Sequence, residues 1–133
     1  LKKIVVKIFL LHQNQSILRN LYLQSHKMSK QEEPDKKIIE KLIFLVNQKK
    51  YSEALNLASK ILDNFPKSIL VNNIAGVIQT ELNNYNLAKK LFIKVVSLNP
   101  KYIDGNYNLA NIYNKLEKED KAIEIYKKSY RIR

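Results

Sequence analysis

The chain matches itself when it is shifted by 34 residues, and this period restricts its fold more than any other feature. Small, aromatic, leucine and proline positions keep the spacing: Ala54, Ala88 and Ala122; Tyr51 and Tyr85; Phe92 and Tyr126; Leu82 and Leu116; Pro66 and Pro100. A fixed period of this length is typical of helical repeat arrays, in which each unit buries its apolar surface against its neighbours. The sequence therefore predicts an all-α protein of stacked helix pairs.

Each repeat divides into two amphipathic halves joined by a short turn. In the first repeat, apolar residues recur every three or four positions over residues 38–46 and again over 51–62, as on one face of a helix. Asp35 is predicted to cap the first helix, because its carboxylate can accept hydrogen bonds from the free amides of the first turn. We expect the turn at Lys49 and Lys50 and the end of the second helix before Pro66. The predicted repeats are 35–68, 69–102 and 103–133.

Small side chains at fixed positions within the 34-residue period, which we call phases, predict where helices approach most closely. Ala54, Ala88 and Ala122 are assigned to the contact between the two helices of a pair. Gly76 and Ala110 are assigned to the crossing of a first helix with the preceding pair. Leu42 stands at that phase in the first repeat, and we expect it to be large because no regular repeat precedes it.

Residues 1–34 do not continue the period and are predicted to be an irregular or partly helical extension. A short helix is predicted over residues 16–24, followed by a polar linker. Met28 is the single methionine and Leu1 opens the chain, so either the chain is a fragment or translation begins at Met28. Both readings stay open. The apolar run over residues 4–11 is far too short to span a bilayer, and no small-residue cleavage site follows it. We expect a cytoplasmic protein.

The formal net charge of +12 is spread over the whole chain. We interpret it as dispersed, solubilising charge, and nucleic acid is a disfavoured partner. The alternative is an anion-binding patch on two predicted outer helices, comprising Lys89, Lys90, Lys94, Lys127 and Lys128.

No pattern for catalysis or for a cofactor is present. The chain has no cysteine, and its two histidines, His12 and His26, lie apart from each other outside the repeats. The glycines are isolated at positions 76 and 105, which excludes a glycine-rich phosphate loop. We therefore expect no metal, no cofactor and no enzyme activity within these residues.

Residues 106–113, Asn-Tyr-Asn-Leu-Ala-Asn-Ile-Tyr, together with the phased residues of the opening paragraph, resemble the tetratricopeptide repeat family. The resemblance extends over residues 35–133. It has departures: Asn72 stands where a large apolar residue is usual and Gln79 where an aromatic one is usual. Lys49, Asn83 and Glu117 replace the turn glycine, which predicts strained turns at Lys49 and Glu117.

The resemblance implies a right-handed α-solenoid whose first helices line a concave groove. Transferred by phase, the groove residues are Lys36, Ile39, Ile43, Val46, Asn47, Leu70, Asn73, Val77, Thr80, Glu81, Asp104, Tyr107, Asn111, Asn114 and Lys115. Family members that clamp the terminal carboxylate of heat-shock chaperones carry Lys and Asn at the phases of Ile39 and Ile43, so this binding mode is not expected here. The resemblance implies a protein-interaction adaptor or scaffold that holds a peptide or a partner helix.

Two further expectations concern what lies beyond this groove. Short arrays of this family also precede transferase domains similar to bacterial sulfotransferases or glycosyltransferases, and a larger enzyme of that kind is the alternative function. The first helix predicted in the first repeat is apolar on all sides over residues 38–46, which is typical of a helix buried on more than one side. We expect residues 16–24 or a second copy of the protein to cover it. In the second case the protein self-associates through its first repeat.

Overall fold

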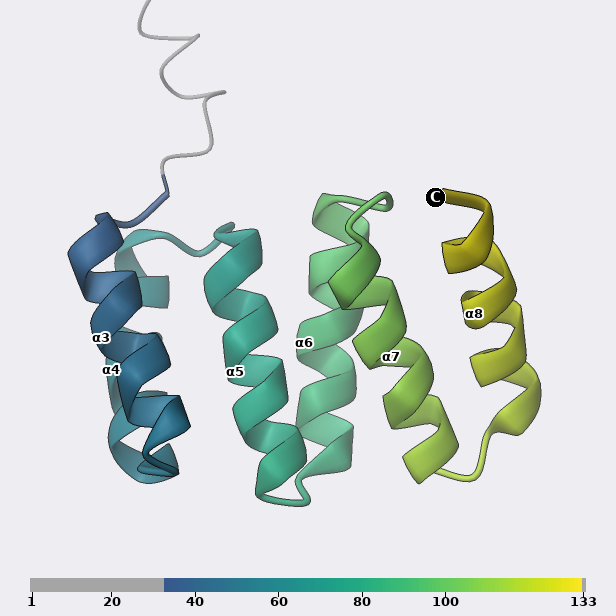
Figure 1. The fold of residues 1–133 in the computed structure, drawn as a ribbon, viewed down its shortest axis with the longest axis horizontal. Coiled ribbons are helices and arrows are strands. Elements are labelled where there is room, and N and C mark those ends of the chain that lie inside the picture. The colour runs from purple at the N-terminus through teal and green to yellow at the C-terminus, as the bar shows by residue number, and fades with distance from the viewer. Residues whose placement is uncertain (1–32, 133) are drawn as a thin grey trace, which may run out of the picture. The chain divides into compact units, whose positions relative to one another are not determined.

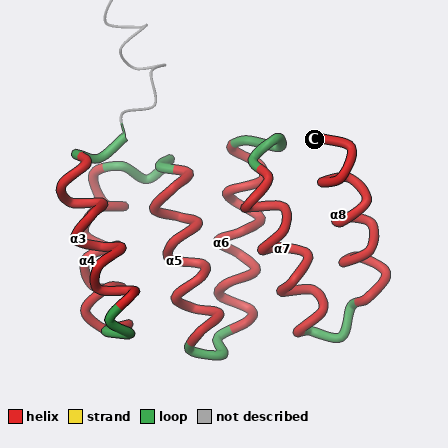
Figure 2. Tube along the Cα trace, viewed as in Figure 1, coloured by secondary structure: helices red, strands yellow, loops and turns green. Residues whose placement is uncertain are grey.

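The computed structural model describes residues 33–132, and this part of the chain is helical without a strand (Figure 2). The helices are α3 (Lys36–Asn47), α4 (Tyr51–Asn64), α5 (Ile69–Glu81), α6 (Tyr85–Leu98), α7 (Ile103–Lys115) and α8 (Glu119–Ile132). The predicted all-α class is confirmed, and each helix pair falls within one predicted repeat. The helix predicted over residues 16–24 and both histidines lie outside the described residues.

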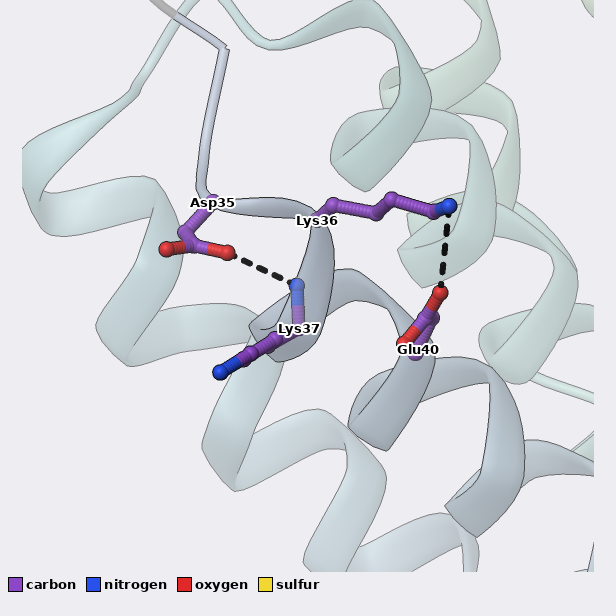
Figure 3. A network of polar contacts seen from close by, with 4 residues as sticks. All are labelled: Asp35, Lys36, Lys37 and Glu40. Atoms are coloured by element: carbon purple, nitrogen blue, oxygen red, sulfur yellow. Dashed lines mark hydrogen bonds and ion pairs between the residues drawn. The ribbon is translucent and has the colours of Figure 1, made fainter.

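In each helix pair we call the leading helix the first helix. Two of the first helices, α3 and α5, have a side-chain cap at their N-terminus. Asp35 Oδ1 accepts a hydrogen bond from the Lys37 backbone N–H at 2.8 Å, which confirms the predicted cap of α3 (Figure 3). The ion pair beside it, Lys36 Nζ to Glu40 Oε1 at 3.7 Å, is exposed to solvent and contributes little. Ser68 caps α5 by accepting from the Val71 N–H at 3.2 Å.

The turn within each pair depends on one residue in the left-handed conformation. Lys49, Asn83 and Glu117, which share a phase, have φ values of 58°, 60° and 58°. The residue after each of them donates its N–H to a carbonyl five residues earlier, at 2.9, 2.9 and 2.8 Å, as in a Schellman motif. The predicted backbone strain at Lys49 and Glu117 is confirmed, since non-glycine residues rarely adopt this conformation.

The helices form two layers with different packing. The first helices α3, α5 and α7 contact one another in sequence, whereas α4, α6 and α8 contact only first helices (Figure 1). The first-helix layer is therefore the more closely packed one, and we take it as the inner side of the stack.

The core lies between these layers. Ala54, Ala88 and Ala122 are each 0% exposed, which confirms that their phase marks a close approach of helices. One cluster joins the first pair to α5, and a second cluster joins α6 to α7.

The role predicted for Gly76 is wrong in one respect. A Cβ at Gly76 would lie 2.5 Å from Cε1 of Phe92, which belongs to α6 of the same pair rather than to the preceding pair. In the first repeat the same two phases hold Leu42 and Ala58, both buried in one cluster. The large and the small residue have thus exchanged phases in the first repeat, which accounts for the size of Leu42 within its own pair.

Candidate functional site: the inner wall

The predicted groove residues lie on α3, α5 and α7, and we call the surface proposed for most of them the inner wall. It consists of Ile39, Ile43, Val46, Asn47, Leu70, Asn73, Val77, Thr80, Tyr107, Asn108, Asn111, Asn114 and Lys115. Asn108 is an addition to the predicted set. All lie in the one layer whose helices contact each other directly.

The α3 end of the inner wall is apolar. Ile43 is 41% exposed and Val46 is half-buried, so both offer aliphatic surface to solvent. Ile39 is 8% exposed and belongs to the hydrophobic core, so it supports the wall from beneath. Asn47 is exposed at the end of the helix.

The α5 part combines aliphatic surface with one amide. Leu70 is 38% exposed and Val77 is half-buried. The Thr80 hydroxyl donates to the Gly76 carbonyl at 2.9 Å, so its hydrogen-bonding capacity is partly used within the helix. Asn73 is 8% exposed, and its Oδ1 accepts from Asn108 Nδ2 of α7 at 3.1 Å.

Asn108 was missed because the residue one period earlier is Ile74, an apolar position packed on the core. The repeat pattern therefore gave no sign that this phase turns polar in α7. The signal that could have revealed it is that residues 35 apart on successive first helices match in polarity. Ile39 and Ile74 are both apolar, and Asn73 and Asn108 are both amides.

The α7 end of the inner wall is aromatic and polar. Tyr107 is 58% exposed, and its ring meets the edge of Tyr126 of α8 with centroids 5.6 Å apart at 61°. Burial raises the pKa of Tyr126, the nearby Tyr107 adds to this, and a hydrogen bond with Asn114 opposes it. Asn111 is half-buried, whereas Asn114 and Lys115 are exposed.

This arrangement suits binding rather than chemistry. Aliphatic and tyrosine surfaces can bury apolar groups of a partner, and amides can both donate and accept hydrogen bonds. Within residues 33–132 no group of three or more histidine, acidic or cysteine side chains could hold a metal ion. No helix in that part of the chain is long and apolar enough to span a membrane.

Some apolar surface of α3 lies away from the inner wall. Ile38 is 37% exposed and Phe44 is 59% exposed. Phe44 has the phase of Ile78 and Ile112, which are both fully buried in the later repeats. The prediction that residues 16–24 or a second copy cover this face stays a prediction.

Comparisons with known proteins agree with this geometry. A family model described as tetratricopeptide repeat matches residues 71–102 and 103–133. No curated protein sequence matches the chain.

Three solved structures show the same fold. MamA from Desulfovibrio magneticus RS-1 (41-end) has a TM-score of 0.68 at 18% identity, covering 71% of this chain and 54% of that one. The first TPR of Spaghetti (RPAP3), bound to the HSP90 peptide SRMEEVD, has a TM-score of 0.69 at 21% identity, covering 71% and 75%. The second TPR of that protein, bound to the same peptide, has a TM-score of 0.68 at 12% identity, covering 83% and 99%.

The chain spans about half the length of the MamA structures it matches, and at these identities the likeness concerns the fold alone. The first pair, α3 and α4, lies outside the matched residues but repeats the same phases and the same left-handed turn. The period, the buried small residues, the paired helices and the family match lead to one conclusion: residues 71–133 are two tetratricopeptide repeats, and α3 and α4 repeat their pattern.

Proposed function

We propose that the chain is a non-catalytic protein-interaction module that binds a peptide segment of a partner protein on its inner wall. The observation that carries the proposal is the aliphatic surface open to solvent on α3 and α5, where Ile43 and Leu70 are exposed and Val46 and Val77 are half-buried. Apolar side chains at a binding surface supply most of the affinity, because they leave water when the partner docks.

The partner differs in chemistry from the one seen on two structural neighbours. The RPAP3 repeats are bound to the acidic peptide SRMEEVD. Here Ile39 and Ile43 stand where the carboxylate-clamping family members carry Lys and Asn, and an aliphatic side chain cannot hold a carboxylate. The proposed partner segment is therefore apolar rather than an acidic tail.

A display library of random peptides tests the proposal with a matched pair of variants. Ile43 on the inner wall and Ile93 on α6 are 41% and 44% exposed, so glutamate at either site perturbs stability to a similar degree. We expect Ile43→Glu to abolish capture of the selected peptides and Ile93→Glu to leave it unchanged. Equal effects of the two variants, or capture of SRMEEVD in preference to apolar peptides, would contradict the proposal.

A further inference from the structure

The positive charge of α6, α7 and α8 is concentrated at one edge of the stack. The connection from α6 to α7 and the C-terminal end of α8 lie on the same side, and we call this side the connection edge (Figure 1). Its cations stand near the ends of α6 and α8 and in the connection between α6 and α7: Lys94, Lys101, Lys127, Lys128 and Arg131. Asp104, in the first turn of α7, is the one carboxylate that the described residues of these helices add at this edge.

The opposite edge of the same helices is electrically balanced. Around the turn between α7 and α8, lysines and carboxylates alternate in equal number: Lys115, Lys118 and Lys121 with Glu117, Glu119 and Asp120. Opposite charges this close together cancel each other's field within a short distance in salt solution. Although the charge is spread along the sequence, the fold therefore gives this part of the chain one positive edge and one neutral edge.

The cations of the connection edge are not engaged within the fold. All five side chains are exposed, and within residues 33–132 none of them has a carboxylate partner. Glu124 lies one turn before Lys127 and Lys128 on α8, but it forms no ion pair with either. The helix dipole accounts for Arg131 in the last turn of α8 but not for Lys94, since the last turn of α6 has no basic residue.

Tyr130 adds an open aromatic ring to these cations. It is 80% exposed and lies on α8 beside Arg131, three residues after Lys127. Within the described residues its ring contacts no other ring and no cation. An aromatic ring flanked by free cations matches a single-stranded polynucleotide, because the phosphates bind the cations and an unpaired base stacks on the ring.

A nucleic-acid duplex and a lipid surface fit this edge less well. In a duplex the bases stack on one another and offer no free face to Tyr130. A helix that binds a bilayer turns an apolar face to the lipid. The apolar face of α8 is turned to its own core instead, since Ala122 is 0% exposed and Ile125 packs against the cluster that joins α6 to α7.

We propose that the connection edge binds a single-stranded polynucleotide, with a base stacked on Tyr130 and the phosphates held by Lys94, Lys101, Lys127, Lys128 and Arg131. None of these residues belongs to the inner wall. The inference therefore goes beyond the proposed function and stands or fails separately from it.

The test measures the fluorescence anisotropy of a labelled oligouridine strand as the whole chain is added, at KCl concentrations from about 50 to 200 mM. Five phosphate contacts predict that the logarithm of the dissociation constant rises linearly with the logarithm of the salt concentration, with a slope of about 3. Binding that ignores salt, or no binding at the lowest salt concentration, would overturn the proposal.

Two charge-reversal pairs separate the edge from the net charge. Lys94→Glu/Lys128→Glu should weaken binding by at least about tenfold and lower the salt slope. Lys50→Glu/Lys118→Glu has the same net charge but changes two exposed lysines of the turns within pairs, so it should bind within about twofold of the parent. Circular dichroism and melting temperature check that both variants fold. Equal losses in the two pairs would overturn the proposal, because net charge alone would then explain binding.

Tyr130 supplies the readout that a charge effect alone does not move. Tyr130→Ala should weaken binding by about tenfold and leave the salt slope unchanged, whereas Tyr130→Phe should bind like the parent, because phenylalanine keeps the stacking face. An unaltered Tyr130→Ala, or equal binding of the strand and of its duplex with oligoadenosine, would overturn the single-stranded guest. Tighter binding to phosphatidylserine vesicles than to oligouridine would assign the edge to a lipid surface and overturn the proposal.

Discussion

Asn72 and Asn106 make the same two hydrogen bonds, one repeat apart. Each side-chain amide donates to the proline carbonyl six residues earlier and to the carbonyl four residues earlier. The distances are 3.1 and 2.7 Å for Asn72, to Pro66 and Ser68, and 3.0 and 2.9 Å for Asn106, to Pro100 and Tyr102. The asparagine thus ties the connection between repeats to the first turn of the next helix, which explains why the second and third repeats carry asparagine at the phase where the first repeat has Ile38.

This relationship predicts the effect of removing the amide donor. Asn72 is 0% exposed, and an aspartate of the same shape would direct an acceptor at two carbonyl oxygens. We expect Asn72→Asp to destabilise the protein by more than about 2 kcal/mol, measured by urea denaturation. The exposed Asn86→Asp should stay within about 0.5 kcal/mol, and a similar loss from both variants would disprove the assigned role.

The fit between Gly76 and Phe92 predicts a compensating pair. Gly76→Leu overpacks against a ring that is 1% exposed and cannot move aside, and Phe92→Ala opens a cavity. The double variant copies Leu42 and Ala58 of the first repeat. Its free energy of unfolding should therefore fall by less than the sum of the losses in the two single variants. We expect a coupling free energy of about 2 kcal/mol in thermal or urea denaturation. Strictly additive losses would show that the two positions do not share one space.

The left-handed turns predict stabilising glycines. Glu117→Gly and Lys49→Gly remove the steric cost of a positive φ and should each stabilise the protein by roughly 0.5–1 kcal/mol. Asn83→Gly should gain less, because asparagine tolerates this conformation better than lysine or glutamate does. Calorimetric melting of the three variants checks the order, and a loss of stability in Glu117→Gly would contradict it.

Two tyrosines predict a decline of stability in alkali. Burial raises the pKa of Tyr102 above its ordinary value near 10, with smaller contributions from Asp104 and Glu33, and the pKa of Tyr126 is also raised. The folded state therefore keeps these protons at a pH where the unfolded chain has lost them. Their contribution is complete below pH 10 and is lost as the pH rises through the folded-state values. Melting temperatures between pH 8 and 11 should fall less steeply in Tyr102→Phe than in the parent, whereas Tyr130→Phe, at an 80% exposed site, should follow the parent.

The period was sufficient to predict the architecture, because packing repeats whenever the small and aromatic phases repeat. It located the helix pairs, the buried Ala54, Ala88 and Ala122, and the strained turns. It could not assign the partner of Gly76, because a single residue at one phase does not indicate which neighbour it faces.

The inner wall was predicted less completely, because position along the period does not determine how far a side chain is buried. Ile39 proved to be a core residue, since α5 packs against it. Asn108 was missed because its counterpart Ile74 is apolar. The contact of Tyr126 on α8 with Tyr107 was not predicted, because the family resemblance assigns the groove to the first helices alone.

The central claim is that a partner peptide binds on the face of α3, α5 and α7. Nitrogen–proton correlation spectra of the labelled chain, recorded while a selected apolar peptide is added, test it directly. The account predicts shifts concentrated at Ile43, Val77 and Tyr107 and at the side-chain amides of Asn73 and Asn108, with α4 and α6 nearly unchanged. Shifts centred on the exposed residues of α4 and α6, with the inner wall silent, would contradict it.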